Sequence, residues 1–84
     1  MEILAGRVRN YFNNIHVASI EVTDSLKEGD LIHIKGHFTD FDQEISSIEI
    51  GHTQVKEATK GQIAGIKVDD YVRKNDLLYR IDNK

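Results

Sequence analysis

The sequence contains no cysteine and no proline. Without cysteine there is no disulfide framework, no thiolate metal site and no cysteine nucleophile, and such a chain suits a reducing cytosol. No apolar run reaches the roughly 18 residues of a spanning helix. The first ten residues, MEILAGRVRN, lack the basic start and apolar stretch of a signal peptide. We therefore expect a cytoplasmic chain without a membrane segment.

Positive charge is in short supply as well. The chain has 11 lysines and arginines against 14 aspartates and glutamates, a net charge of -3. This balance argues against a chain built mainly to bind a phosphate backbone, although it leaves room for a local basic patch. The phosphate-binding pattern G-x-x-x-x-G-K-[ST] is missing too, and TKGQIAG does not fulfil it. We expect no nucleotide and no cofactor.

What the chain does have is enough apolar content for one small folded unit. Its 84 residues are 39% apolar and 30% charged, an ordinary globular composition. A chain of this length can bury one modest core. We therefore expect a single domain over residues 1–84.

Apolar residues recur at every second position, which is the period of a half-buried β-strand. The alternating positions include Ala18-Ile20-Val22, Ile32-Ile34, Ala64-Ile66-Val68 and Leu77-Tyr79-Ile81. Strands are predicted at about 3–12, 16–22, 31–37, 41–50, 62–68 and 77–82, with a short piece near 52–56. Only residues 53–61 could form a short helical turn. Many short strands favour an all-β fold, a small closed antiparallel β-barrel of six or seven strands, because closure removes exposed edges.

The segment FDQEISSIEI changes phase within one predicted strand. Phe41 and Ile45 share one parity, whereas Ile48 and Ile50 share the other. One extra residue in a strand corrects such a shift, so we expect a β-bulge at Ser46-Ser47.

Two stretches, LKEGDLI and VRKNDLL, are nearly the same. Gly29 and Asn75 are the residue types that most readily adopt positive φ, and Asp30 and Asp76 follow them directly. Each stretch is predicted to be a tight turn that leads into a strand, with the preceding Leu26 or Val72 packed beneath it. The flanking sequences do not match, which favours two similar turns over an internal duplication.

The order of these pieces resembles the second domain of translational GTPases, the β-barrel of elongation factor Tu and its relatives. The resemblance rests on Gly6-Arg7-Val8, LKEGD, Ile32, Ile34, Gly36, Ser47-Ile48-Glu49, Gly65-Ile66 and Asp76-Leu77-Leu78. Residues 11–41 look closer to a small stand-alone translation-factor-like family. They are also similar to the C-terminal barrel appended to collagenase-like peptidases.

The resemblance implies a translation-protein type of barrel without the GTPase that usually accompanies it. A non-catalytic binding module for tRNA or the ribosome is the function it favours. The alternative is a protein-interaction subunit that docks on a separately encoded enzyme, such as a collagenase-like peptidase homologue. Function inferred from fold alone is analogy, and no pocket residue of the family is transferred to this chain.

The residues most suggestive of a binding role lie in the first predicted strand. Strict alternation places Arg7, Arg9 and Tyr11 on one outer face, opposite Val8 and Phe12. Arginine neutralises phosphate and tyrosine offers a stacking surface for a base, so these three residues are our candidate RNA contact. The alternative is an ordinary polar strand face.

Histidines and carboxylates provide weaker candidates. His33 and His37 are four residues apart, about 13 Å along a strand, too far to share one ion. We therefore expect exposed histidines and no metal site. The alternate residues Asp40, Asp42 and Glu44 could do acid–base work or bind a cation, but they are more simply a solvated strand face. No catalytic residue is expected.

Overall fold

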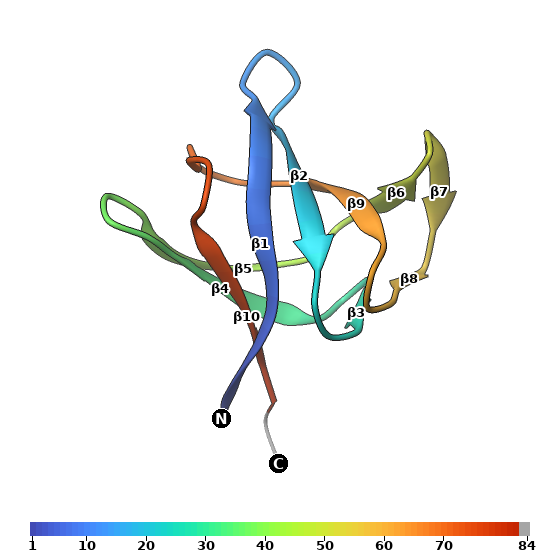
Figure 1. The fold of residues 1–84 in the computed structure, drawn as a ribbon, viewed down its shortest axis with the longest axis horizontal. Helices are drawn as coiled ribbons and strands as arrows, with labels where there is room; N and C mark the ends of the chain where they lie inside the picture. The colour runs from blue at the N-terminus through green and yellow to red at the C-terminus, as the bar shows by residue number, and fades with distance from the viewer. Residues whose placement is uncertain (83–84) are drawn as a thin grey trace.

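The computed structural model describes residues 1–82 and is all-β over that range (Figure 1). The last two residues of the predicted domain, 83–84, lie outside this description. The strands are β1 (Glu2–Phe12), β2 (Val17–Val22), β3 (Leu26–Lys27), β4 (Leu31–Lys35), β5 (Asp40–Glu44), β6 (Ile48–Ile50), β7 (Thr53–Val55), β8 (Glu57–Ala58), β9 (Ile63–Lys67) and β10 (Leu77–Ile81). The predicted helical turn at 53–61 is wrong, because this segment forms β7 and β8.

Eight strands form one antiparallel sheet in the order β5-β4-β10-β1-β2-β9-β6-β7, and β3 pairs separately with β8. Among residues 1–82 the outer strands β5 and β7 do not pair with each other, so the sheet curves without closing into the predicted barrel. Ile45 extends the pairing of β5 with β4 into the preceding turn, since its N–H donates to the Asp30 carbonyl and its carbonyl accepts from the Gly29 N–H. The chain then crosses to β6, which pairs with β9.

A side chain partly bridges the open side of this curved sheet. Gln43 of β5 is buried, with 5% of its surface exposed. Its Nε2 donates to the carbonyl of Lys67 at 3.0 Å, and its Oε1 accepts from the backbone N–H of Asp69 at 2.7 Å. A buried amide with both ends satisfied thus ties β5 to the end of β9 where no strand ladder exists.

The phase change at Ser46-Ser47 is a break in the strand and not a β-bulge. Between β5 and β6 the strand is interrupted, and both Ile45 and Ile48 are buried, so the interruption replaces the predicted bulge. The irregular registers lie in β1 instead, between Leu4 and Gly6 and between Val8 and Asn10. These irregularities bend a long strand so that it pairs with both β10 and β2.

The core under the sheet is aliphatic. Its members are Ala5, Val8, Ala18, Ile20, Val22, Leu26, Ile32, Ile34, Ile45, Ile48, Ala58, Ala64, Ile66, Val68, Val72 and Leu78. In β10 the buried side chain is Leu78, out of phase with the alternation of Leu77 and Tyr79 expected from sequence. Because β-branched residues pack well on a pleated surface, short strands suffice to enclose this core.

The two similar stretches have the same backbone structure. Gly29 and Asn75 have φ of 92° and 76°. In each turn the aspartate accepts the backbone N–H three residues earlier at 2.8 Å, from Lys27 to Asp30 and from Arg73 to Asp76. The aspartate N–H donates back to the same residue's carbonyl at 3.0 Å. Leu26 and Val72, just before the turns, are fully buried.

The two ends of the described chain lie side by side at one pole of the molecule (Figure 1). Met1 and Asp82 exchange hydrogen bonds, since the Asp82 N–H donates to the Met1 carbonyl at 2.8 Å. The β1–β2 loop lies at the opposite pole, and the β4–β5 hairpin projects to one side (Figure 1). Residues 1–82 contain no helix of the length and apolar character needed to cross a membrane.

Candidate interaction surface

The three residues predicted to share the outer face of β1 do not all point the same way. The irregular register at Arg9 shifts the alternation, so that Tyr11 pairs with buried Ala18 and packs against the core. Arg7 is half-buried and Arg9 is exposed. The structure therefore keeps the two arginines near each other and turns the tyrosine to the other side of the strand.

Lys74 takes the place of Tyr11 beside the two arginines. A shallow polar hollow of about 280 Å³ is lined by Arg7, Arg9, Asn10 and Lys74, which we call the cationic hollow. β1 supplies the first three and the turn before β10 supplies the lysine. Three cations around one concavity create a local positive potential on a chain whose net charge is -3.

Arg7 is fixed at one wall of the cationic hollow. Its Nη2 donates to Glu21 Oε1 at 2.7 Å and its Nη1 donates to Asn75 Oδ1 at 2.7 Å. The hydrogen bond from Arg7 holds the pKa of the Glu21 carboxyl below its ordinary value. Arg7 is thereby partly neutralised, whereas Arg9 and Lys74 make no ion pair among residues 1–82.

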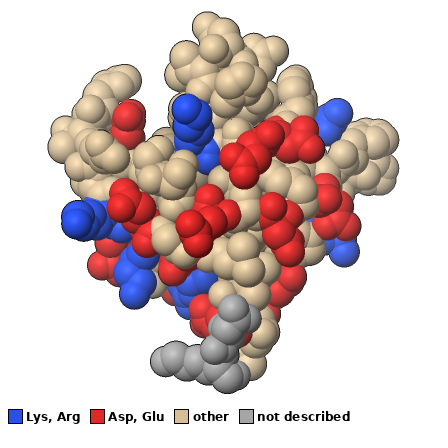
Figure 2. Space-filling model, turned by 180° about the vertical axis from the view of Figure 1, so that it is seen from behind, with Lys and Arg blue, Asp and Glu red and all other residues tan. Residues whose placement is uncertain are grey.

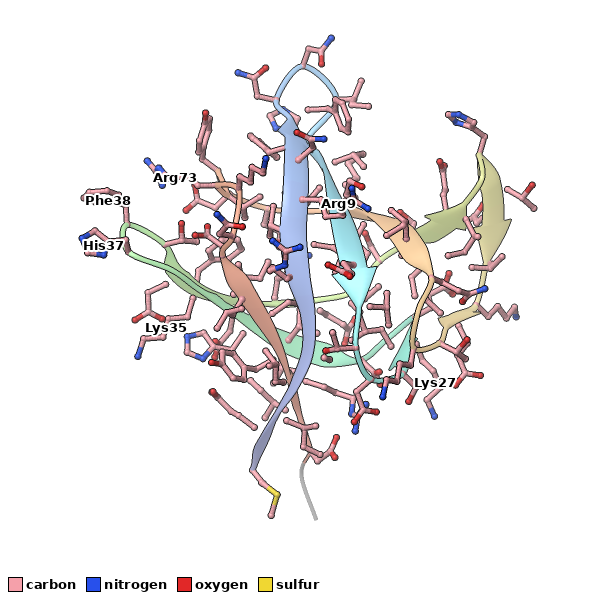
Figure 3. The ribbon with its side chains drawn as sticks, viewed as in Figure 1. Arg9, Lys27, Lys35, His37, Phe38 and Arg73 are labelled. Carbon is pink, nitrogen blue, oxygen red and sulfur yellow. The ribbon has the colours of Figure 1, made fainter. Side chains whose placement is uncertain are left out.

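A second group consists of Phe38, Tyr71 and Arg73, which we call the aromatic platform. Figure 3 shows Phe38 and Arg73 close together at the tip of the β4–β5 hairpin. The guanidinium carbon of Arg73 lies 5.5 Å from the Phe38 ring centroid and 5.0 Å from that of Tyr71. Phe38 is 75% exposed and Tyr71 is 52% exposed. Arg73 therefore forms cation–π contacts with two rings that are themselves largely open to solvent.

The close packing of Gly36 against Asp76 determines where this platform lies. Phe38 occupies the tip of the β4–β5 hairpin, which begins where the Gly36 N–H donates to the Thr39 carbonyl at 2.7 Å. A Cβ at Gly36 would collide with the carboxylate of Asp76, so the hairpin packs tightly on the Arg73–Asp76 turn. The close approach brings Phe38 and Arg73 together.

His33 departs from the expectation of an exposed histidine. Its side chain is only 14% exposed and lies between two carboxylates, with Nδ1 2.8 Å from Glu2 Oε2 and Nε2 2.5 Å from Asp40 Oδ1. The hydrogen bond to Asp40 raises the pKa of His33 above 6.5, and Glu2 adds to the effect. The same contact lowers the pKa of Asp40. The group ties β1, β4 and β5 together.

The acidic residues of β5 lie on one exposed face, with Asp40 held by His33. The face turned away from the viewer of Figure 1 carries acidic side chains across its middle (Figure 2). Within residues 1–82 no group of three or more histidine, cysteine or carboxylate side chains is arranged to hold a metal ion.

A second concavity, mostly apolar, lies on the outer face of β2 and β9. It has a volume of about 440 Å³, and its walls include Phe12, Ile15 and Ile63. These three side chains are 41–57% exposed. It carries little charge, since Glu49 is its single carboxylate and no lysine or arginine lines it.

Sequence reasoning missed Phe38, Tyr71, Arg73 and Lys74. A phenylalanine in GHFT, between two polar strand ends, is an available signal, because a turn rarely needs a large apolar side chain. The pairing of Phe38 with Arg73 is not readable from sequence, since 35 residues separate them.

Solved structures establish the class of fold. The C-terminal domain of a candidate U32 peptidase from Geobacillus thermoleovorans matches with a TM-score of 0.89 at 20% identity, covering 95% of this chain and 93% of that domain. Its selenomethionine variant matches at 0.85 and 22% identity, covering 89% and 95%. At this identity the likeness shows a shared fold. No family model matches the chain.

Curated relatives are closer in sequence. The chain is 39% identical over 79 residues to an uncharacterised protease of Methanocaldococcus jannaschii, covering 93% of this chain and 19% of that protein. It is 36% identical over 85 residues to a collagenase of Porphyromonas gingivalis, covering 99% and 20%. The chain thus spans about a fifth of the length of these relatives. The matches support the resemblance to the barrel of collagenase-like peptidases and do not show the one to translational GTPases.

Proposed function

We propose that this chain is a non-catalytic protein-interaction module that docks on an enzyme of the collagenase-like peptidase class. One observation carries the proposal. Nearly the whole chain aligns with relatives named as a protease and a collagenase, but the alignment covers only about a fifth of the length of each. The part of those relatives that matches this chain is small, which supports an accessory role for it. A cysteine-free chain of this kind suits the cytosol, where we place it.

Contact with tRNA through Arg7 and Arg9 is the competing hypothesis. The cationic hollow supports it in part, because two arginines and a lysine converge there. Tyr11, the third residue of the predicted contact, is partly buried, packs against the core and points to the other side of the strand from the two arginines. The comparisons name peptidase-type relatives, which favour protein docking.

Affinity purification of the tagged chain from its source organism tests the proposal. We expect a collagenase-like peptidase homologue, identified by mass spectrometry, to co-purify in stoichiometric amount and to survive ribonuclease treatment. Recovery of RNA or ribosomes without such an enzyme would contradict protein docking and restore the tRNA hypothesis. Substrate turnover by the isolated chain would contradict its non-catalytic character.

A further inference from the structure

We propose that the aromatic platform and the cationic hollow form one docking surface, and that its partner is an acidic segment of another polypeptide. The inference rests on the proposed docking function and says where the contact lies and what chemistry it recognises. The chain connects the two groups at Arg73 and Lys74, consecutive residues of one turn, since Arg73 belongs to the platform and Lys74 lines the hollow.

The placement of the aromatic residues is the first argument. The chain has three phenylalanines and three tyrosines, yet none belongs to the fully buried core of residues 1–82. Phe38 and Tyr71 are instead largely exposed, and Tyr11 stands edge-on to Tyr71 with ring centroids 4.8 Å apart. Exposed aromatic side chains together with arginine are the composition of binding hot spots.

The rigidity of the platform is the second argument. Arg73 Nη1 lies 3.4 Å from both the Phe38 carbonyl and the Thr39 hydroxyl, while its guanidinium faces two rings. The backbone of Arg73 is held by Asp76. A side chain that is already ordered loses little conformational freedom on binding, so more of each new contact appears as affinity.

Charge complementarity is the third argument and defines the partner. Arg9 and Lys74 carry positive charge without an ion-pair partner among residues 1–82, and Arg9 projects from the outer face of β1 (Figure 3). No carboxylate of the described residues lines the hollow itself, and Glu21 offsets one of its three cations by pairing with Arg7. The hollow therefore presents net positive charge through Arg9 and Lys74, which carboxylates of a partner would neutralise.

A protein segment fits this surface better than a nucleic acid does. The four cations of this surface, Arg7, Arg9, Arg73 and Lys74, could neutralise at most four phosphates, a salt slope of only about -3 for single-stranded RNA, and so few phosphate contacts give weak binding. The face in Figure 2 is acidic across its middle, so a long nucleic acid could not follow the surface round the molecule.

The test is an NMR titration of the isotope-labelled chain with three probes. The first is an acidic peptide of aspartate and glutamate around one tryptophan, the second is the same peptide with lysine at the acidic positions, and the third is a short single-stranded oligouridylate. We expect the acidic peptide alone to shift the amides of Phe38, Arg73, Lys74 and Arg9, with affinity that falls as salt rises.

Variants assign the binding to this surface. Phe38→Ala/Arg73→Ala should weaken peptide binding at least about tenfold. Arg73→Lys should lose part of the affinity, because lysine keeps the charge but not the planar stacking. Ile63→Ala, in the apolar concavity, is the matched control and should bind like wild type.

Each other outcome overturns the inference. Shifts with oligouridylate but not with the acidic peptide would assign the surface to nucleic acid. Equal shifts with the lysine peptide, shifts elsewhere, or no shifts with any probe would show that the surface does not recognise acidic polypeptide. If the enzyme co-purifies equally well with Phe38→Ala/Arg73→Ala, this surface is wrong while the docking function stands. If wild type recovers no enzyme, the docking function itself fails.

Discussion

A single histidine links three strands near the start of β1. His33 lies between the carboxylates of Glu2 and Asp40, which accept its N–H groups when the ring is protonated, and its pKa is raised while that of Asp40 is lowered. A histidine with a raised pKa in the folded state stabilises the fold below its ordinary value of 6.5, and this stabilisation disappears as pH rises through the folded pKa. For Asp40 the stabilisation is present above pH 3.8, its ordinary pKa, and it disappears as the pH falls through the lowered pKa of the folded state.

We expect the contribution of this contact to be largest between about pH 4 and pH 6.5. Urea denaturation of wild type and His33→Gln at pH 5.5 and pH 8.5 checks it, and the stability difference between the two proteins should be larger at pH 5.5. His37→Gln, at the exposed hairpin tip, leaves the contact intact and is the control. A difference that is the same at both values, or larger at pH 8.5, would show that His33 is not held in its charged form.

At the scale of elements, the turns at Lys27–Asp30 and Arg73–Asp76 have the same internal hydrogen bonds. Each also pairs with a buried residue outside it: Ile45 bonds to Gly29 and Asp30, and Val8 bonds to Asn75 and Asp76. The two near-identical sequences therefore build two equivalent anchors for neighbouring strands.

Gly29 tests the backbone requirement of this turn. Its φ is 92°, and a Cβ there would meet no atom within 4 Å, so the cost of substitution is conformational and not steric. Gly29→Val should destabilise the fold by about 1–3 kcal/mol, seen as a lower midpoint in thermal unfolding followed by circular dichroism. Gly29→Asn copies the residue of the other turn and should cost less. Equal losses in both variants would contradict this explanation.

How far the sequence predicts these elements depends on the range of the interaction. Alternation and turn chemistry are local, and they predicted the main strands and both turns closely. Bends such as the one at Arg9 in β1 depend on pairing with two different strands, so Tyr11 was placed on the wrong face. Closure of the sheet would need β5 to pair with β7, a contact between strands that the local pattern does not specify. The aromatic platform depends on a hairpin packing against a loop 35 residues away.

At the scale of the whole molecule, the aliphatic core stabilises the fold, and the surface has regions of different chemical character. The face in Figure 2 is acidic across its middle, whereas the cationic hollow gathers two arginines and a lysine and is connected by the chain to the aromatic platform. Such an uneven surface suits a module that binds in one orientation.

The most direct test of the account is binding between the purified chain and a collagenase-like peptidase homologue from the same organism, followed by sedimentation velocity in the absence of RNA. The account predicts a faster-sedimenting complex that contains both chains. The two proteins sedimenting separately, while the chain alone binds the acceptor end of tRNA, would contradict it.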